Sequence, residues 1–263
     1  MDVRDIVSDH YGGSGLIDRI LAAYAAAGAD VERLVPEQLT TIDELHAGFT
    51  PATEHLLDRL GAGAGTRLLD VGCGIGGPSR LAAGRGCTVT GVDVTADFVD
   101  AARELTRRTG LGGSASFHHT AAESLPFDDA TFDVAMMIHV GMNIPDKQAV
   151  FAEVHRVLAP GGRFALFEQM RAGSGLLPYP LPWADDERSS FVESPQEYAA
   201  ALDAAGFTVV ETTDRTAEVV GPPRPGLVPP TVVLGADLVT RIDNNVAATR
   251  AGLLGAFLVL AET

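Results

Sequence analysis

The stretch LLDVGCGIGG at residues 68–77 decides the fold that this sequence predicts. Its first residues form an apolar, strand-like run, its glycines predict a tight turn, and SRLAA at 79–83 predicts a following helix. Glycine permits positive φ angles and lacks the Cβ atom that would keep a ligand away from the backbone. The helix N-terminus offers free N–H groups to an anionic group. This strand–turn–helix junction predicts a parallel α/β protein that binds a nucleotide-like ligand.

The glycine spacing fits two kinds of ligand. Gly72, Gly74 and Gly77 match G-x-G-x-x-G, which is typical of dinucleotide binding. With Gly76 in place of Gly77, the pattern becomes G-x-G-x-G, which is typical of S-adenosylmethionine binding. Asp70 favours the second ligand, because its carboxylate would repel a pyrophosphate and attract the cationic amino-acid end of S-adenosylmethionine. A turn without any ligand is the alternative, since a glycine pattern alone is a weak signal.

Composition and charge narrow the functional class. The 263 residues are 46% hydrophobic, enough for one large α/β domain with a sizeable core. The net charge of −16 argues against nucleic-acid binding as the main function. The two cysteines, Cys73 and Cys87, predict no disulfide framework and a reducing cytoplasm. The charged N-terminus predicts no signal peptide, and the longest apolar run, 253–261, is too short for a membrane span.

Strands and helices alternate after an N-terminal helical part. This alternation predicts a doubly wound, mostly parallel, Rossmann-like sheet with right-handed crossovers. We expect a helical cap at residues 1–60, a ligand-binding core at 61–170, and a lid followed by the rest of the same sheet at 171–263. The expected strands are Arg67–Val71, Thr88–Val92, Ser114–His118, Phe132–Ile138, Arg163–Glu168, Phe207–Thr213 and Ala256–Glu262. The expected helices of this part are Pro78–Gly84, Ala96–Thr109, Gln148–Leu158, Pro195–Gly206 and Leu234–Leu254.

The N-terminal cap shows three helical segments. Residues 16–24 carry apolar residues at helical spacing, and Gly28 predicts the C-cap of this helix. Thr41 is expected to cap a second helix that carries Glu44, because the two have the spacing of a capping box. A third helix, Pro51–Leu60, leads into the first strand.

Polar side chains follow the strands at the edge where parallel sheets bind ligands. Asp93, His139 and Glu168 all fall at or just beyond the carboxyl ends of expected strands. Asp93 lies 21 positions after Gly72, close to the spacing at which an acidic residue binds ribose hydroxyls. Its alternative role is the N-cap of the helix that begins near Ala96.

Residues 171–195 interrupt the alternation. They contain four prolines, two glycines and the single tryptophan, Trp183. Such a stretch predicts a kinked loop with an apolar surface, which would form the wall or lid of a pocket. The alternative is a surface connection in which Trp183 fills the core.

Four ordered motifs resemble the class I S-adenosylmethionine-dependent methyltransferases. They are LLDVGCGIGG at 68–77, GVDVT at 91–95, AESLPFDDATFD at 122–133 and RVLAPGGRFALFE at 156–168. Three further stretches, TIDELHAGFTPAT at 41–53, HVGMNIPDK at 139–147 and YPLPWA at 179–184, are similar to a bacterial subgroup related to sarcosine and dimethylglycine N-methyltransferases. The resemblance implies the seven-stranded methyltransferase fold and S-adenosylmethionine as cofactor, with S-adenosylhomocysteine as product.

The resemblance also implies which residues hold the cofactor. The three glycines of the G-x-G-x-G pattern would approach its amino-acid part and ribose, and Asp93 would bind the ribose hydroxyls. Val94, Ala122 and Glu123 would lie beside the adenine. The family commonly has Asp before Ala122, where this chain has Ala121. This departure implies that the Ala122 backbone binds the adenine amino group or that adenine binding is weaker.

Methyl transfer needs an aligned acceptor and often a base, because a protonated amine or a phenol must lose its proton. His139 is the candidate for positioning the acceptor or removing its proton, and it also lies where the cofactor is expected. Glu168 could accept a proton or attract a cation, and Asn143 could form a hydrogen bond to the acceptor. Tyr11 lies where related enzymes close an N-terminal segment over the cofactor, and His46 could join the same pocket. Ordinary packing, capping or core roles are the alternatives for all five.

The sequence therefore predicts a cytoplasmic methyltransferase that acts on a small-molecule acceptor, as a monomer or homodimer, without nucleic-acid or membrane partners. The expected acceptor is an amine nitrogen like that of sarcosine or dimethylglycine. The alternatives are O- or C-methylation of a larger natural product and, more distantly, a non-catalytic protein that binds S-adenosylmethionine. No metal site is expected, because His118 and His119 lack a third ligand at suitable spacing.

Overall fold

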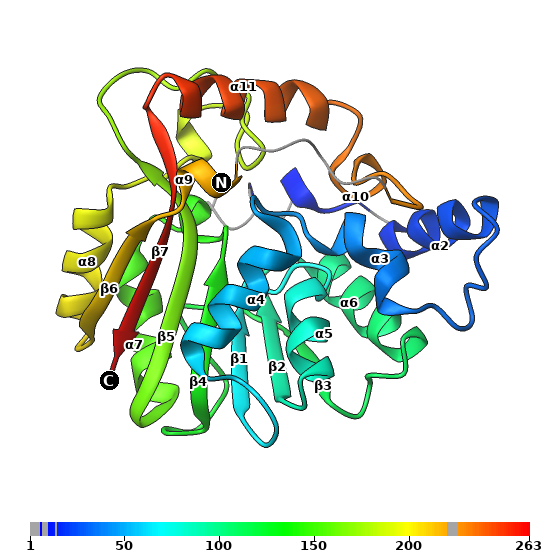
Figure 1. The fold of residues 1–263 in the computed structure, drawn as a ribbon, viewed down its shortest axis with the longest axis horizontal. Helices are drawn as coiled ribbons and strands as arrows, with labels where there is room; N and C mark the ends of the chain where they lie inside the picture. Colours follow the sequence, from blue (N-terminus) through cyan, green and yellow to red (C-terminus); the bar gives the residue numbers. More distant parts are fainter. Residues whose placement is uncertain (1–5, 7–9, 14, 220–225) are drawn as a thin grey trace.

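The computed structural model describes residues 6, 10–13, 15–219 and 226–263. Seven strands form one sheet in the order β3–β2–β1–β4–β5–β7–β6, and only β7 runs antiparallel to its neighbours (Figure 1). The predicted doubly wound, mostly parallel sheet is confirmed. The strands are β1 (Arg67–Val71), β2 (Thr88–Asp93), β3 (Ala115–His119), β4 (Phe132–Ile138), β5 (Leu158–Arg171), β6 (Thr208–Asp214) and β7 (Leu254–Glu262).

Helices cover both faces of the sheet, because alternate strand residues point to opposite faces and both faces are apolar. Leu68 packs with α4 (Phe49–Leu60), α5 (Gly77–Gly84) and α6 (Ala96–Arg108) on one face. Its neighbour Leu69 packs with α7 (Lys147–Val157) and α8 (Pro195–Ala204) on the other. Each fully buried side chain of this size contributes roughly 1.5–3 kcal/mol to folding. The core therefore lies in two layers that hold the strand ends in place.

The remaining helices gather beyond the edge at which the parallel strands end (Figure 1). Leu16, Ile20 and Ile42 of the cap pack against Phe98 and Leu105 of α6. Of these helices, α2 (Leu16–Ala26) and α3 (Pro36–Asp43) belong to the cap, whereas α10 (Thr231–Leu234) packs against α2 and α11 (Leu238–Arg250) runs across the same edge. The short helices are α9 (Thr216–Val219), η1 (Gly141–Asn143) and η2 (Glu187–Ser189).

The second helix of the cap differs from the prediction. It is α3, which begins at Pro36, and Thr41 lies inside it rather than at its N-cap. The predicted capping box of Thr41 and Glu44 is wrong, because proline at the first position and the Gln38 side chain already define the helix start. Oε1 of Gln38 accepts the Val35 N–H at 2.9 Å. Glu44 follows the helix and is free for other contacts.

The predicted C-terminal helix is also interrupted. Gly235, at φ 88°, separates α10 from α11, so the expected helix 234–254 shrinks to Leu238–Arg250. The predicted C-cap at Gly28 is wrong by one residue, because α2 ends at Ala26 and Ala27 is its C-cap; Gly28 follows with a left-handed φ of 84°. The division of the chain at residues 60 and 170 stays a prediction.

The loop at 171–195 packs firmly between the sheet and α11. Trp183 is 3% exposed, and its indole N–H donates to Oγ of Ser190 at 3.0 Å. Nδ2 of Asn244 in α11 donates to the Pro180 carbonyl at 2.9 Å. Trp183 thus belongs to a small core under α11, as the alternative prediction stated, and it also faces the cavity described below. Movement of this loop stays a prediction.

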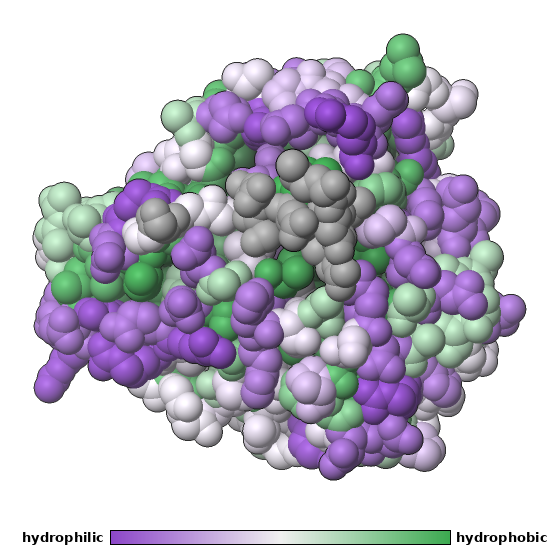
Figure 2. Space-filling view, turned by 180° about the vertical axis from the view of Figure 1, so that it is seen from behind, coloured by the Kyte–Doolittle hydropathy of each residue, from purple (hydrophilic) through white to green (hydrophobic). Residues whose placement is uncertain are grey.

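On the face in Figure 2, hydrophilic residues dominate and hydrophobic residues are scattered among them. Within the described part of the chain, no helix is both long and apolar enough to cross a membrane.

Candidate active site

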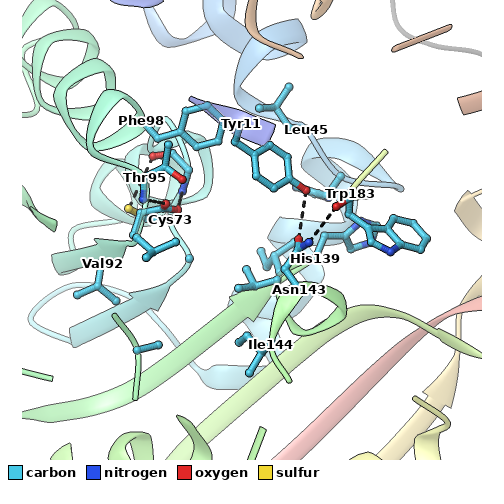
Figure 3. Close-up of a pocket in the computed structure, with 18 of the residues that line it drawn as sticks. Tyr11, Leu45, Cys73, Val92, Thr95, Phe98, His139, Asn143, Ile144 and Trp183 are labelled. Carbon is cyan, nitrogen blue, oxygen red and sulfur yellow. Dashed lines mark hydrogen bonds between the residues drawn. The ribbon is translucent and has the colours of Figure 1, made fainter. Parts of the chain in front are cut away.

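A cavity of about 200 Å³ lies at the carboxyl ends of β1, β2 and β4, beneath the cap. Figure 3 shows its residues on two sides, with Tyr11 between them. The glycine-loop side consists of Gly72, Cys73, Gly74, Ile75, Val92, Asp93, Val94, Thr95, Phe98, Thr120, Ala122 and Glu123. The Trp183 side consists of Leu45, His46, His139, Val140, Met142, Asn143, Pro182, Trp183 and Leu234.

The glycines of the loop after β1 have different surroundings. Gly72 and Gly74 line the cavity with φ values of 73° and 53°. A Cβ atom at Gly72 would lie 2.3 Å from Cγ2 of Val140, so only glycine fits there. At Gly74 nothing lies within 4 Å of the Cβ position, which leaves open space above the backbone. Gly76 does not line the cavity, because its Cβ position faces Phe117 and Arg80.

Asp93 ends β2 and organises the glycine loop. Its Oδ2 accepts the Gly74 N–H at 2.9 Å, and its Oδ1 accepts the Thr95 N–H at 2.8 Å. Burial raises the pKa of Asp93, and the N–H groups of Thr95 and Gly74 oppose that rise. The Thr95 side chain also bonds to this carboxylate, which lines the cavity. The structure places Thr95 at the N-cap of α6, so the alternative role of Asp93 as the N-cap is wrong.

Three further predicted residues line the glycine-loop side. Val94, Ala122 and Glu123 face the cavity, whereas Ala121 does not line it. The exposed His119 fixes the neighbouring backbone, because its Nε2 lies 3.0 Å from the Val94 carbonyl oxygen. The described geometry brings these residues together with Asp93 and Gly74.

Asp70 lies behind the loop rather than in the cavity. It is 2% exposed, and Oδ2 accepts the Ser79 hydroxyl at 2.6 Å. Burial raises the pKa of Asp70 to about 7, although the bond from Ser79 opposes the rise. It does not line the cavity, so direct contact with a cationic ligand group is not supported. Its position fits a role in joining the strand to α5.

His139 follows β4 and lines the Trp183 side. Its φ of 53° is left-handed, which costs a residue with a side chain about 1–2 kcal/mol. The ring packs against Phe167, with 5.5 Å between the ring centroids. Burial, and then the charge of His46, hold the pKa of His139 well below its ordinary value. Its buried Nε2 has no hydrogen-bond partner among the described residues. His139 is therefore a neutral ring that can take up a proton.

His46 lies beside His139 and is held by a buried network. Its Nδ1 is 2.9 Å from the Ala47 carbonyl oxygen, and its Nε2 is 2.7 Å from Oε2 of Glu44. The Thr53 hydroxyl oxygen also lies 3.0 Å from this Nε2. The His46 and His139 centroids are 5.9 Å apart. The cap thus places the Glu44–His46 pair next to His139.

A chain of hydrogen bonds joins the N-terminal segment to the Trp183 side (Figure 3). The Tyr11 hydroxyl donates to Oδ1 of Asn143 at 3.2 Å, and Nδ2 of Asn143 donates to the Trp183 carbonyl at 2.9 Å. Burial also raises the pKa of Tyr11, which keeps its hydroxyl protonated. Asn143 is occupied by these partners, so it connects three wall segments rather than presenting a free amide.

Glu168 does not line the cavity. It is fully buried in β5, and its two oxygens lie 3.0 and 3.1 Å from the Val140 backbone nitrogen. Burial raises the pKa of Glu168 to about 8, against the opposing effects of two backbone N–H groups and Lys147. The predicted direct contact with an acceptor is therefore not supported.

The polarity of the two sides differs. Among the described lining residues, none is Lys or Arg, and the Trp183 side is mostly apolar. Asp43 lines the cavity but pairs with the buried Arg80, whose Nε lies 3.2 Å from Oδ2 of Asp43. Within the described part of the chain, no group of three or more His, Cys, Asp or Glu residues is placed to hold a metal ion.

Sequence reasoning missed several apolar wall residues. Leu45, Phe98, Met142, Pro182 and Leu234 come from five separate segments and face one cavity. The sequence around each of them is typical of ordinary core residues. Only the tertiary structure, which brings the five segments together, identifies them as cavity residues.

A methyltransferase-domain family matches residues 69–166. The methyltransferase GfsG of Streptomyces halstedii is 33% identical over 203 residues, which are 72% of this chain and 69% of that protein. The chain is an S-adenosylmethionine-dependent methyltransferase. The 27-O-demethylrifamycin SV methyltransferase of Amycolatopsis mediterranei is 36% identical to it over 179 residues, which are 63% of this methyltransferase and 64% of that protein.

Solved structures agree with the fold of this methyltransferase. A geranyl diphosphate methyltransferase in complex with S-adenosylmethionine has a TM-score of 0.66 and 26% identity, over 81% of this chain and 84% of that chain. A protein described as a putative sarcosine dimethylglycine methyltransferase from Galdieria sulphuraria has a TM-score of 0.63. Its identity is 18%, over 80% of this chain and 84% of that chain, so it agrees in fold alone.

Proposed function

We propose that this methyltransferase transfers the methyl group to a hydroxyl oxygen of a largely apolar, uncharged small molecule, and that His139 accepts the hydroxyl proton. The observation that carries the proposal is a histidine in an apolar wall, with its pKa held well below the ordinary value and with a ring nitrogen that has no partner among the described residues. This is the predicted alternative of a larger natural product, rather than the predicted amine.

The cofactor fits the glycine-loop side. Asp93 offers lone pairs to the ribose hydroxyls, and the open space above Gly74 admits the amino-acid part of the cofactor close to the backbone. Val94, Ala122 and Glu123 would line the adenine. S-adenosylmethionine supplies an electrophilic methyl group on a sulfonium ion whose departure as a thioether is favourable.

Methyl transfer to a hydroxyl oxygen then requires alignment of the oxygen with the methyl group and one proton acceptor. The acceptor oxygen attacks the methyl carbon, the carbon–sulfur bond breaks, and its electron pair stays on the sulfur. The hydroxyl proton goes to His139. Such a base contributes about 10²–10⁴-fold, and alignment of the reactants contributes more. The low pKa of His139 keeps the ring unprotonated and ready for this step at neutral pH.

The lining residues that the structure describes include no Lys or Arg, which argues against an amino-acid acceptor. Sarcosine and dimethylglycine carry a carboxylate, and burying a carboxylate without a cationic partner is unfavourable. The described lining residues include no Lys or Arg, but they do include Leu45, Met142 and Trp183. The relative from Amycolatopsis mediterranei, whose name refers to a 27-O-demethyl compound, further supports an oxygen acceptor.

A product-based assay tests this function. Purified protein is incubated with S-adenosylmethionine carrying a ¹³C-methyl group and with apolar phenols, apolar macrocyclic alcohols, geranyl diphosphate, sarcosine or dimethylglycine. We expect S-adenosylhomocysteine release with the hydroxyl compounds, and an oxygen-bound methyl signal in the NMR spectrum of the product. Turnover of sarcosine or dimethylglycine alone would contradict the proposal and favour the amine. A carbon-bound methyl would favour C-methylation.

A further inference from the structure

The turn after β4 is held by a side chain of the neighbouring strand. Pairing between β4 and β5 ends at Ile138 and Phe167, and the His139 N–H still donates to the Phe167 carbonyl at 2.9 Å. The next amide, that of Val140, has both carboxyl oxygens of Glu168 within 3.1 Å. Beyond the paired part of β4 and β5, the Glu168 side chain thus replaces a backbone carbonyl as the acceptor for the Val140 N–H.

This hydrogen bond lies directly after a residue with an unfavourable backbone conformation. His139 is left-handed at φ 53°, and such a residue keeps this conformation only where its surroundings hold it. Glu168 is 0% exposed, so water cannot readily replace it as the acceptor for Val140. An unsatisfied buried N–H is costly. Removal of this acceptor should therefore release the turn.

The same turn touches the glycine loop. The Val140 side chain occupies the space that a Cβ atom at Gly72 would need, at 2.3 Å from Cγ2. The position of Val140 therefore affects both His139, which precedes it, and Gly72, which it contacts.

Glu168 is suited to accepting a hydrogen bond rather than to exchanging protons with an acceptor. It does not line the cavity. Burial raises the pKa of its carboxyl to about 8, with Lys147 as the cation that opposes this rise. Near neutral pH the carboxyl is mostly uncharged, and its carbonyl oxygen is enough to accept the Val140 N–H.

We propose that Glu168 is a positioning residue: it accepts the Val140 N–H, holds the left-handed turn, and so directs the His139 ring into the cavity. The inference rests on the proposed role of His139 in proton removal. It replaces the predicted direct action of Glu168 on the acceptor.

Two substitutions separate these roles. Glu168→Gln keeps an acceptor oxygen and removes the titrating carboxyl, whereas Glu168→Leu removes the acceptor at similar size. Gln169→Leu is the matched control, because Gln169 is the adjacent buried residue and its Oε1 has no described partner. The His139 ring signals are followed by NMR in the full-length protein and are identified by their loss in His139→Gln. The kcat is measured with the hydroxyl acceptor that the wild type turns over.

We expect Glu168→Gln and Gln169→Leu to keep the His139 ring signals and the kcat close to the wild type. Glu168→Leu should shift those ring signals and lower kcat by up to about 100-fold, as misplacement of a reacting group can do. The KM for S-adenosylmethionine should change less than kcat. In the His139→Gln background, Glu168→Leu should cause little additional loss of kcat, because the two residues act through one another.

Three results would overturn the inference. One is a Glu168→Gln variant with low kcat and unchanged ring signals, which would make the carboxyl itself an acid or base. Another is a folded Glu168→Leu variant with unchanged ring signals. If the leucine variant does not fold, the kcat and the His139 ring signals of Glu168→Gln alone decide whether the carboxyl acts as an acid or base. The third is equal losses from Glu168→Leu with and without His139. If instead His139→Gln retains wild-type kcat, the proposed function fails, while the ring signals still test the positioning.

Discussion

The two sides of the cavity are built in different ways. On the glycine-loop side, the turn after β1, the end of β2 with the start of α6, and the segment after β3 supply the lining, and Asp93 is bonded to the backbone of Gly74. On the Trp183 side, the wall comes from the N-terminal segment, the cap, the turn after β4, the loop at 171–195 and α10. The first side is local and backbone-based, whereas the second depends on contacts between distant segments. We therefore propose that cofactor binding and acceptor choice can vary independently in this methyltransferase.

The largest effect should separate chemistry from cofactor binding. His139→Gln should lower kcat by about 10²–10⁴-fold, because it removes the proposed proton acceptor. Binding of S-adenosylmethionine, measured by calorimetry, should stay near the wild type, since the ring belongs to the Trp183 side. His118→Gln is the control, because His118 is exposed and outside the cavity. Equal losses in kcat and cofactor affinity would contradict the assignment of His139 to the side that binds the acceptor.

The next effect belongs to the glycine-loop side. Asp93→Ala should weaken S-adenosylmethionine binding by about 100-fold, since hydrogen bonds to a charged group contribute roughly 1.5–3 kcal/mol each. Calorimetric titration measures the change, and Asp100→Ala on the exposed face of α6 is the control. Unchanged cofactor affinity in a folded Asp93→Ala protein would show that this side is assigned wrongly.

A third change tests how the cap is joined to the glycine loop. A Cβ atom at Gly77 would lie 2.2 Å from the backbone oxygen of Asp43, whereas nothing lies within 4 Å of the Cβ position at Gly84. Gly77→Ala should lower the free energy of unfolding by about 1–3 kcal/mol through this steric conflict. Gly84→Ala should change it little. Denaturant unfolding of both variants measures the contrast, and equal stabilities would contradict the close approach.

A fourth prediction concerns pH. The pKa of Glu168 is raised from 4.5 in the unfolded chain to about 8 in the folded one. The stability that this group contributes is therefore fully present below about 4.5 and is lost as pH rises through about 8. Glu168→Gln should show a smaller fall in the free energy of unfolding over this range, measured by denaturant titration. The raised pKa values of Asp43 and Asp70 act in the same direction, but both residues remain in the variant. If the free energy of unfolding of Glu168→Gln depended on pH in the same way as that of the wild type, the raised pKa of Glu168 would be contradicted.

The smallest effect should come from the contact between the two sides. Tyr11→Phe removes the hydroxyl that donates to Asn143 at 3.2 Å and keeps the ring. A neutral hydrogen bond contributes about 0.5–1.5 kcal/mol, so the KM of the acceptor should rise by a few-fold, with little change in kcat. Tyr179→Phe is the control, because Tyr179 does not line the cavity. A large loss of kcat would show that the Tyr11 hydroxyl takes part in the chemistry.

The sequence by itself determined the sheet, its seven strands and the place of the glycine loop at the cavity, although Asp70 and Gly76 do not line it. The reason is that these features rest on local patterns: apolar strands, glycines where backbone must adopt positive φ, and Asp93 directly after a strand. It also singled out His139, because that residue follows β4 at the ligand-binding edge.

Only the tertiary structure decided what the other polar residues do. The expected strand ended at Glu168, but β5 continues to Arg171, and the Glu168 side chain turns to the Val140 amide. Asn143 is likewise occupied by Tyr11 and Trp183, which are far away in sequence. A sequence pattern reports which face or end a residue occupies, but not which distant group fills the space beside it. The apolar wall of the acceptor side is therefore a property of the packed chain, because five separate segments must meet to form it.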